Sequence, residues 1–173
     1  KSGGYTLQEF KTTTSFTVAQ LKPTFTSSAE FKSAGYTITD LREFNDFTLS
    51  QLRVVAGYSA TQMNQANITA SDAKSAGYLL FALKEGGYTT SELYGANYTA
   101  LEMKNDGFTV PEELINVGYT LQNIYDASFD AGLLLALQYT ASQLKTVGYN
   151  ASQLKTGGYD SQQLKTAEFT ALQ

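Results

Sequence analysis

The sequence predicts an all-α fold, a solenoid of about seventeen two-turn helices with one helix in each repeat of 10 or 11 residues. Three observations favour this fold. An aromatic residue recurs every 9 to 11 residues, and a Thr, Ser, Asn or Asp usually follows it. A leucine-like residue comes four positions after that polar residue, and a glycine usually ends the repeat. Internal repetition of this kind decides the architecture before any single residue does.

The aromatic residues mark where each repeat begins. Ten of the twelve tyrosines lie on this register, and Ile68 fills its one gap. The aromatic anchors are Tyr5, Phe16, Phe25, Tyr36, Phe47, Tyr58, Tyr78, Tyr88, Tyr98, Phe108, Tyr119, Phe129, Tyr139, Tyr149, Tyr159 and Phe169.

The repeat at 139–148 shows how each position suits a short helix. Thr140 is placed as the N-cap, whose hydroxyl accepts a hydrogen bond from a free backbone amide. Gln143 follows three residues later and completes a capping box. Lys145 lies towards the C-terminal end, where a cation meets the negative end of the helix dipole. Gly148 is free to adopt the left-handed conformation that ends the helix.

The same cap position recurs along the chain. In the repeat that begins at Phe25, Ser27 and Glu30 form the expected box, so the register there is slipped. Pro111 suits the first turn of its helix, because its missing amide costs little there. The cap candidates are Thr6, Thr17, Thr37, Thr48, Ser59, Thr69, Thr89, Thr99, Thr109, Thr120, Asp130, Thr140, Asn150, Asp160 and Thr170.

Helices this short must depend on their neighbours. A helix of about seven residues spans only about 10 Å and is unstable alone in water. Each repeat must therefore gain burial from the repeats beside it, as in a solenoid. The rival fold is a β-solenoid with a tyrosine ladder, but the sequence lacks the period-two alternation of strands.

Both ends of the sequence fall inside a repeat. We therefore expect residues 1–173 to form a single repeat array that is a segment of a longer protein or assembly. Neither end carries the atypical polar repeat that shields an open solenoid end, so end-to-end self-association is the other expectation.

Residues 139–159 carry a resemblance to a known kind of repeat. They read Tyr-Thr-Ala-Ser-Gln-Leu-Lys-Thr-Val-Gly-Tyr-Asn-Ala-Ser-Gln-Leu-Lys-Thr-Gly-Gly-Tyr. This resembles the tandem decapeptide repeats of pattern AGY-T/S-x-x-x-LK found in proteins of bacteria, algae and large DNA viruses. The resemblance covers nearly the whole chain. It implies a short-helix repeat scaffold, and it brings no catalytic residue and no ligand.

Composition disfavours catalysis and nucleic-acid binding. The net charge is −4 and the lysines are spread one per repeat, whereas nucleic-acid binding needs clustered Lys and Arg. Histidine and cysteine are absent, which removes the commonest general base and thiolate metal sites. The acid pairs Glu112–Glu113 and Asp126–Asp130 are better explained by the helix dipole than by metal or acid–base chemistry. We expect no cofactor, no metal and no membrane span.

Several residues break the repeat pattern and are candidates for contact with other chains. Leu79 replaces a capping residue, Phe81 replaces a small polar residue, and Leu133 and Leu135 replace a box residue and a lysine. Exposed apolar side chains of this kind tend to mark contact surfaces. A thicker local core explains these four equally well. The candidate interface residues are Leu79, Phe81, Leu133, Leu135 and the two off-register tyrosines Tyr94 and Tyr125.

The leading functional hypothesis is a non-catalytic structural or assembly scaffold that packs against other protein chains. The alternative is an extracellular or surface solenoid that binds protein or glycan. Sequons at Asn67, Asn97 and Asn150 would accept glycans only on a secreted eukaryotic protein. The missing cysteines leave the compartment open, and an extracellular or virion-surface assembly is the favoured expectation.

Overall fold

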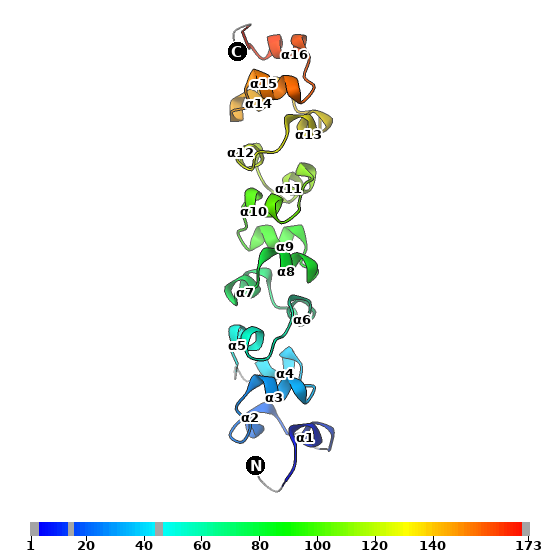
Figure 1. Ribbon diagram of the computed structural model, residues 1–173, viewed down its shortest axis with the longest axis vertical. Coiled ribbons are helices and arrows are strands. Elements are labelled where there is room, and N and C mark those ends of the chain that lie inside the picture. Colours follow the sequence, from blue (N-terminus) through cyan, green and yellow to red (C-terminus); the bar gives the residue numbers. More distant parts are fainter. Residues whose placement is uncertain (1–3, 14–15, 44–46, 171–173) are drawn as a thin grey trace. The chain divides into compact units, whose positions relative to one another are not determined.

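The computed structural model describes residues 4–13, 16–43 and 47–170, and within those ranges every regular element is a short α-helix (Figure 1). This confirms the short-helix solenoid and excludes the β-solenoid for the described residues. The helices are α1 (Leu7–Thr13), α2 (Val18–Leu21), α3 (Ser28–Ser33), α4 (Ile38–Arg42), α5 (Leu49–Val54), α6 (Ala60–Gln65), α7 (Ala70–Ser75), α8 (Leu80–Glu85), α9 (Thr90–Gly95), α10 (Ala100–Asn105), α11 (Pro111–Val117), α12 (Leu121–Asp126), α13 (Ala131–Ala136), α14 (Ala141–Val147), α15 (Ala151–Thr156) and α16 (Ser161–Thr166).

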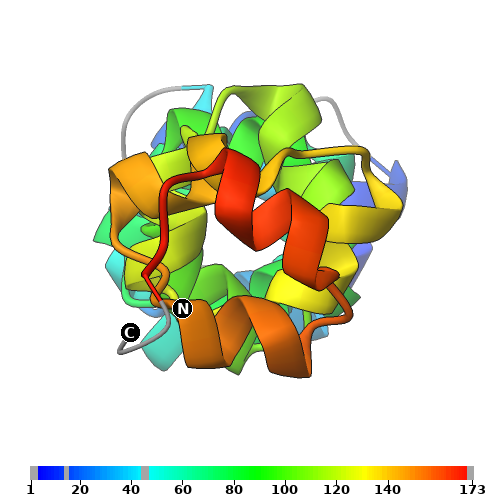
Figure 2. The same ribbon diagram turned by 90° about the horizontal axis from the view of Figure 1, so that it is seen from above.

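The chain divides into two compact units, the N-terminal unit Lys1–Glu92 and the C-terminal unit Leu93–Gln173. Inside each unit, a helix packs mainly on the helix two repeats away. In the N-terminal unit α3 packs on α5, α5 on α7 and α6 on α8. In the C-terminal unit α10 packs on α12, α12 on α14, α13 on α15 and α14 on α16. Figure 2 looks along this stack and shows α13 to α16 lying on different sides of a common axis.

Positions in each repeat are numbered here from the aromatic residue, so that in 139–148 Tyr139 is position 1 and Gly148 is position 10. The predicted cap at position 2 is confirmed in most repeats. Reciprocal capping boxes begin at Thr6, Thr17, Ser27, Thr37, Thr48, Ser59, Thr89, Thr99, Thr120, Thr140, Asn150 and Asp160.

Among the described helices, two lack a side-chain cap, α8 and α11. Leu79 occupies the N-cap of α8 without a capping hydrogen bond, as its apolar side chain requires. The predicted cap at Thr109 is wrong, because Val110 is the N-cap of α11 and also makes no side-chain cap. This repeat has 11 residues, and the extra residue moves the start of the helix to Pro111, which lies in the first turn as predicted.

In most of the described repeats, the last residue ends the helix in the left-handed conformation, as predicted. Gly148 has a φ of 114°, and the amide of the next aromatic residue, Tyr149, donates to the carbonyl of Leu144 at 3.1 Å. This six-to-one hydrogen bond is the Schellman closure of a helix. Where glycine is absent, an Asn, Ser, Gln or Glu adopts the same conformation: Asn67, Asn97, Ser128, Gln138 and Glu168.

The core consists of one aliphatic or aromatic side chain at position 6 together with the aromatic anchors. Most anchors are buried, and so are most residues at position 3, such as Ala141. The position 6 side chains that are fully buried include Leu41, Leu52, Met63, Leu83, Leu93, Met103, Ile124, Leu134, Leu144 and Leu154, and Phe31 takes the same place in the slipped repeat. Each short helix therefore contributes one apolar edge to a core shared with its neighbours.

Candidate functional site

The lysine at position 7 bonds to the end of another helix. The Nζ of Lys104 donates to the carbonyls of Ala127 at 3.0 Å and Ser128 at 2.6 Å. The Nζ of Lys145 donates to two carbonyls two repeats on, each at 2.9 Å. This differs from the expectation that each lysine serves the C-terminal end of its own helix. The cation does meet free helix carbonyls, but they belong to the helix stacked two repeats later.

The same cations lie over aromatic rings of that later repeat. The Nζ of Lys104 lies 4.9 Å from the centroid of the Phe129 ring. Such cation–π contacts add to the hydrogen bonds and fix the lysine stem along the surface. Further pairs include Lys11 with Tyr36 at 4.6 Å, Lys22 with Phe47 at 4.9 Å, Lys32 with Tyr58 at 4.6 Å, Arg53 with Tyr78 at 5.8 Å and Lys145 with Phe169 at 4.7 Å.

The interface candidates Tyr94 and Tyr125 occupy this same position 7. The Tyr94 ring packs edge-to-face on Tyr119 with centroids 4.8 Å apart, and Tyr125 packs in the same way on Tyr149 at 4.9 Å. Tyr94 is 40% exposed and Tyr125 is half-buried. Each ring thus replaces the lysine contact within the chain, while its role towards other chains stays a prediction.

The hydroxyls of the anchor tyrosines form a second link between repeats. The Tyr149 Oη donates to the carbonyl of Phe129 at 2.7 Å, and the Tyr88 Oη donates to that of Ile68 at 2.8 Å. Burial, with weaker contributions from nearby negative groups, raises the pKa of both hydroxyls to about 12. These hydroxyls are therefore structural donors, since each is held in its neutral form.

Three of the four apolar interface candidates lie on the surface. Leu79 is 76% exposed, Phe81 is 59% exposed and Leu133 is 44% exposed. Leu135 is half-buried, and its side chain lies beside Gly158. Leu79 and Phe81 belong to one repeat of the N-terminal unit, and Leu133 belongs to the C-terminal unit.

The structure gives the paired acids ordinary structural roles. Asp130 is the N-cap of α13, and its Oδ1 accepts from the amide of Gly132 at 2.7 Å. Asp126 accepts a hydrogen bond from the side-chain Nε2 of Gln122 at 2.8 Å. Glu112 and Glu113 lie in the first turn of α11, as the dipole argument predicts. Among the described residues, no group of three or more His, Cys, Asp or Glu side chains is arranged to hold a metal ion.

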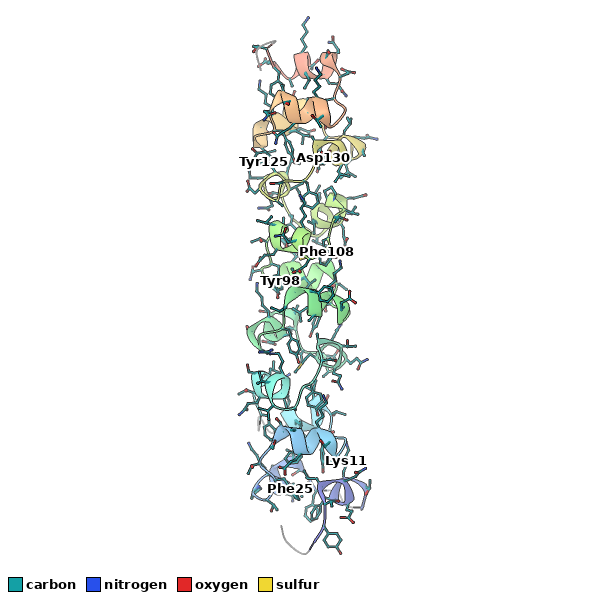
Figure 3. The ribbon with its side chains drawn as sticks, viewed as in Figure 1. Lys11, Phe25, Tyr98, Phe108, Tyr125 and Asp130 are labelled. Carbon is teal, nitrogen blue, oxygen red and sulfur yellow. The ribbon has the colours of Figure 1, made fainter. Side chains whose placement is uncertain are left out.

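Surface grooves recur at one register of the repeat. Each is bounded by the turn that opens one helix and by positions 4, 5 and 8 of the helix two repeats later. A groove of about 560 Å³ lies between the start of α13 and α15, where Asp126 and Asp130 line it. Figure 3 labels Tyr125 and Asp130 on this part of the C-terminal unit. A groove of about 420 Å³ lies one repeat later, between the start of α14 and α16, and its lining is uncharged.

The three sequons differ in how their asparagines are used. Asn67 and Asn97 are exposed at position 10, where an asparagine tolerates the left-handed backbone. Asn150 is the N-cap of α15 and accepts from the amide of Gln153 at 2.9 Å. All three asparagines thus have a structural reason to be present, independent of any glycan.

Comparison with known proteins decides the family. Residues 46–112 and 111–173 each match the decapeptide repeat region family. The chain belongs to this family. No curated protein and no solved structure matches the chain. The family match covers most of the sequence, which confirms the predicted tandem decapeptide repeat. None of the described helices is both long and apolar enough to cross a membrane.

Proposed function

We propose that this decapeptide repeat array is a non-catalytic scaffold that associates with other copies of itself through apolar side chains at outward repeat positions. The observation that carries the proposal is the exposure of Leu79 and Phe81, at 76% and 59%, in a repeat most of whose sisters place polar side chains there. Association is favourable when a partner covers exposed leucine and phenylalanine side chains, because their apolar surface is then removed from water.

The use of polar side chains inside the array supports the same proposal. Cap hydroxyls, position 7 cations and anchor hydroxyls bond to backbone groups of the chain, as at Thr140, Lys104 and Tyr149. These groups build the fold and do not converge on a reacting centre. A scaffold needs only a stable backbone and a few contact residues, and this chain supplies both.

The test compares the apolar patch with a matched exposed residue. We expect Leu79→Thr with Phe81→Ser to reduce the sedimentation coefficient of the associated species to that of the monomer. The first change also introduces a missing N-cap, which stabilises a helix by about 1 kcal/mol, so unfolding would not explain the loss. The matched control is Val110→Thr, since Val110 is 54% exposed and is an uncapped N-cap as well.

Three outcomes would contradict the proposal. The wild-type chain could sediment as a monomer at every concentration, or the double variant could associate like the wild type. Loss of association in Val110→Thr alone would place the contact elsewhere.

A further inference from the structure

The uncharged groove between the start of α14 and α16 holds several polar groups without a partner. It has a volume of about 420 Å³ and is lined by Gln138, Tyr139, Ser142, Gln162 and their neighbours. The side chains of these four residues make no hydrogen bond within the described part of the chain. Two carboxamides, a phenol and a hydroxyl thus belong to the residues that line one groove, and each can both donate and accept hydrogen bonds.

Tyr139 departs from the hydroxyl ladder of its sisters. Tyr149 and Tyr159 donate their hydroxyls to the carbonyls of Phe129 and Tyr139, at 2.7 Å and 2.6 Å, and both are buried. Tyr139 is half-exposed, and its own hydroxyl has no partner among the described residues. Packing does not require this hydroxyl, since Phe129 occupies position 1 of the preceding repeat. It is therefore available to a ligand.

Gln138 occupies a position that its residue type disfavours. It has a φ of 65°, in the left-handed region where most repeats place glycine or asparagine. A side chain with a Cβ is strained in this conformation. Locally unfavourable residues of this kind are commonly associated with a functional site. Gln138 lines the groove beside Tyr139, and its carboxamide can hydrogen-bond to a ligand there.

We propose that this groove binds a neutral saccharide, a function that goes beyond the scaffold role. Hydroxyls of a sugar both donate and accept, which matches the carboxamides of Gln138 and Gln162 and the hydroxyl of Tyr139. The Tyr139 ring and Leu135 supply apolar surface for the C–H face of a sugar ring. The volume lies within the range of small-molecule sites, roughly 300–1,000 Å³.

The equivalent groove one repeat earlier differs in charge, and this difference favours a neutral ligand for the groove at Tyr139. Asp126 and Asp130 line that groove, and the Tyr149 hydroxyl beside it already donates to a backbone carbonyl. Its carboxylates favour cations. The Tyr139 groove has no charged lining residue, so a neutral, multiply hydroxylated ligand fits it best.

The test is a nuclear magnetic resonance titration of the full chain with three neutral probes, maltotriose, cellotriose and triacetylchitotriose. We expect at least one probe to shift backbone amides at 138–142 and 161–166. Gln138→Gly should weaken that binding about tenfold, the loss of roughly one hydrogen bond, while raising the melting temperature. Tyr139→Phe should also weaken binding with the fold intact. Ser152→Ala, at the position in the acidic groove that Gln162 holds here, is the matched control and should bind like the wild type.

Absence of shifts with all three probes would overturn the assignment. So would shifts centred on other residues, or unchanged affinity in both Gln138→Gly and Tyr139→Phe. Because Gln138→Gly is expected to stabilise the chain, a loss of binding in this variant cannot be attributed to unfolding.

Discussion

Replacing Lys104 with alanine tests whether position 7 holds two repeats together. In the C-terminal unit its Nζ donates to the carbonyls of Ala127 and Ser128 and lies over the Phe129 ring. Alanine removes all three contacts and keeps helix propensity, since alanine is the best helix former. A loss of stability would therefore come from the contacts with the later repeat.

The magnitude follows from the contacts. Each ammonium–carbonyl hydrogen bond contributes about 1 kcal/mol at this half-buried site after allowance for solvent screening. The ring contact adds about 0.5–1 kcal/mol, and ordering the lysine side chain costs about 1 kcal/mol. The expected loss is thus about 1.5–2 kcal/mol in the free energy that protects the end of α12. A lysine that served only its own helix dipole would contribute about 0.3–1 kcal/mol.

Native-state hydrogen exchange measures this loss residue by residue. The amides of Ala127, Ser128 and Phe129 are hydrogen-bonded at the end of α12, and we expect them to exchange faster in Lys104→Ala. Lys104→Tyr should recover much of the protection, because Tyr94 and Tyr125 make the equivalent contact on tyrosine rings. Faster exchange confined to Asp106 and Gly107, at the end of the lysine's own helix, would refute the reasoning.

Three further predictions follow from packing and burial. Leu144→Ala should lower the free energy of unfolding by about 2–5 kcal/mol, because Leu144 is fully buried. A loss below about 1 kcal/mol in urea unfolding would contradict the shared core. Gly157→Ala should cost about 1–3 kcal/mol, since its Cβ would lie 2.6 Å from the amide nitrogen of Gly132, and an unchanged melting temperature would exclude this close approach. Four buried tyrosines should leave stability unchanged up to pH 10 and lower it from pH 10 to 12, because burial raises their folded-state pKa above the ordinary value of 10.0 to about 12. A free energy of unfolding in urea that does not fall between pH 10 and 12 would refute this. These four are Tyr58, Tyr88, Tyr119 and Tyr149.

The start and end of most helices could be predicted from sequence because local chemistry decides them. The capping boxes at Thr140 and Thr99 and the left-handed turn at Gly148 depend on residues only a few positions apart. The slipped box of Ser27 and Glu30 was predictable for the same reason. The error at Thr109 arose because a residue was inserted in that repeat, and either Thr109 or Val110 could then precede the helix.

The stacking of alternate helices could not be predicted, because the period of a repeat does not reveal how many repeats make one turn. The hydrogen-bond partners of Lys104 could therefore not be predicted from the sequence, because they lie 23 and 24 residues later. The groove between the start of α14 and α16 could not be predicted for the same reason, since its walls come from two stacked repeats. A sequence signal that could have pointed to it is Gln138, a glutamine at a glycine position.

The residues found at position 7 show which property of this side chain the stacking of repeats requires. Besides lysine and arginine, Asn64 occupies this position and its Nδ2 donates to the carbonyl of Gly86 at 3.0 Å. Tyr94 covers Tyr119 there, and Leu135 lies beside Gly158 with no polar contact at all. A requirement for positive charge would exclude these residues. The common property is a side chain that covers the end of the helix stacked two repeats later, and lysine meets it best because its stem is long and its ammonium also satisfies the free carbonyls. Residues without this reach, such as serine or alanine, should therefore be the substitutions that loosen the stack.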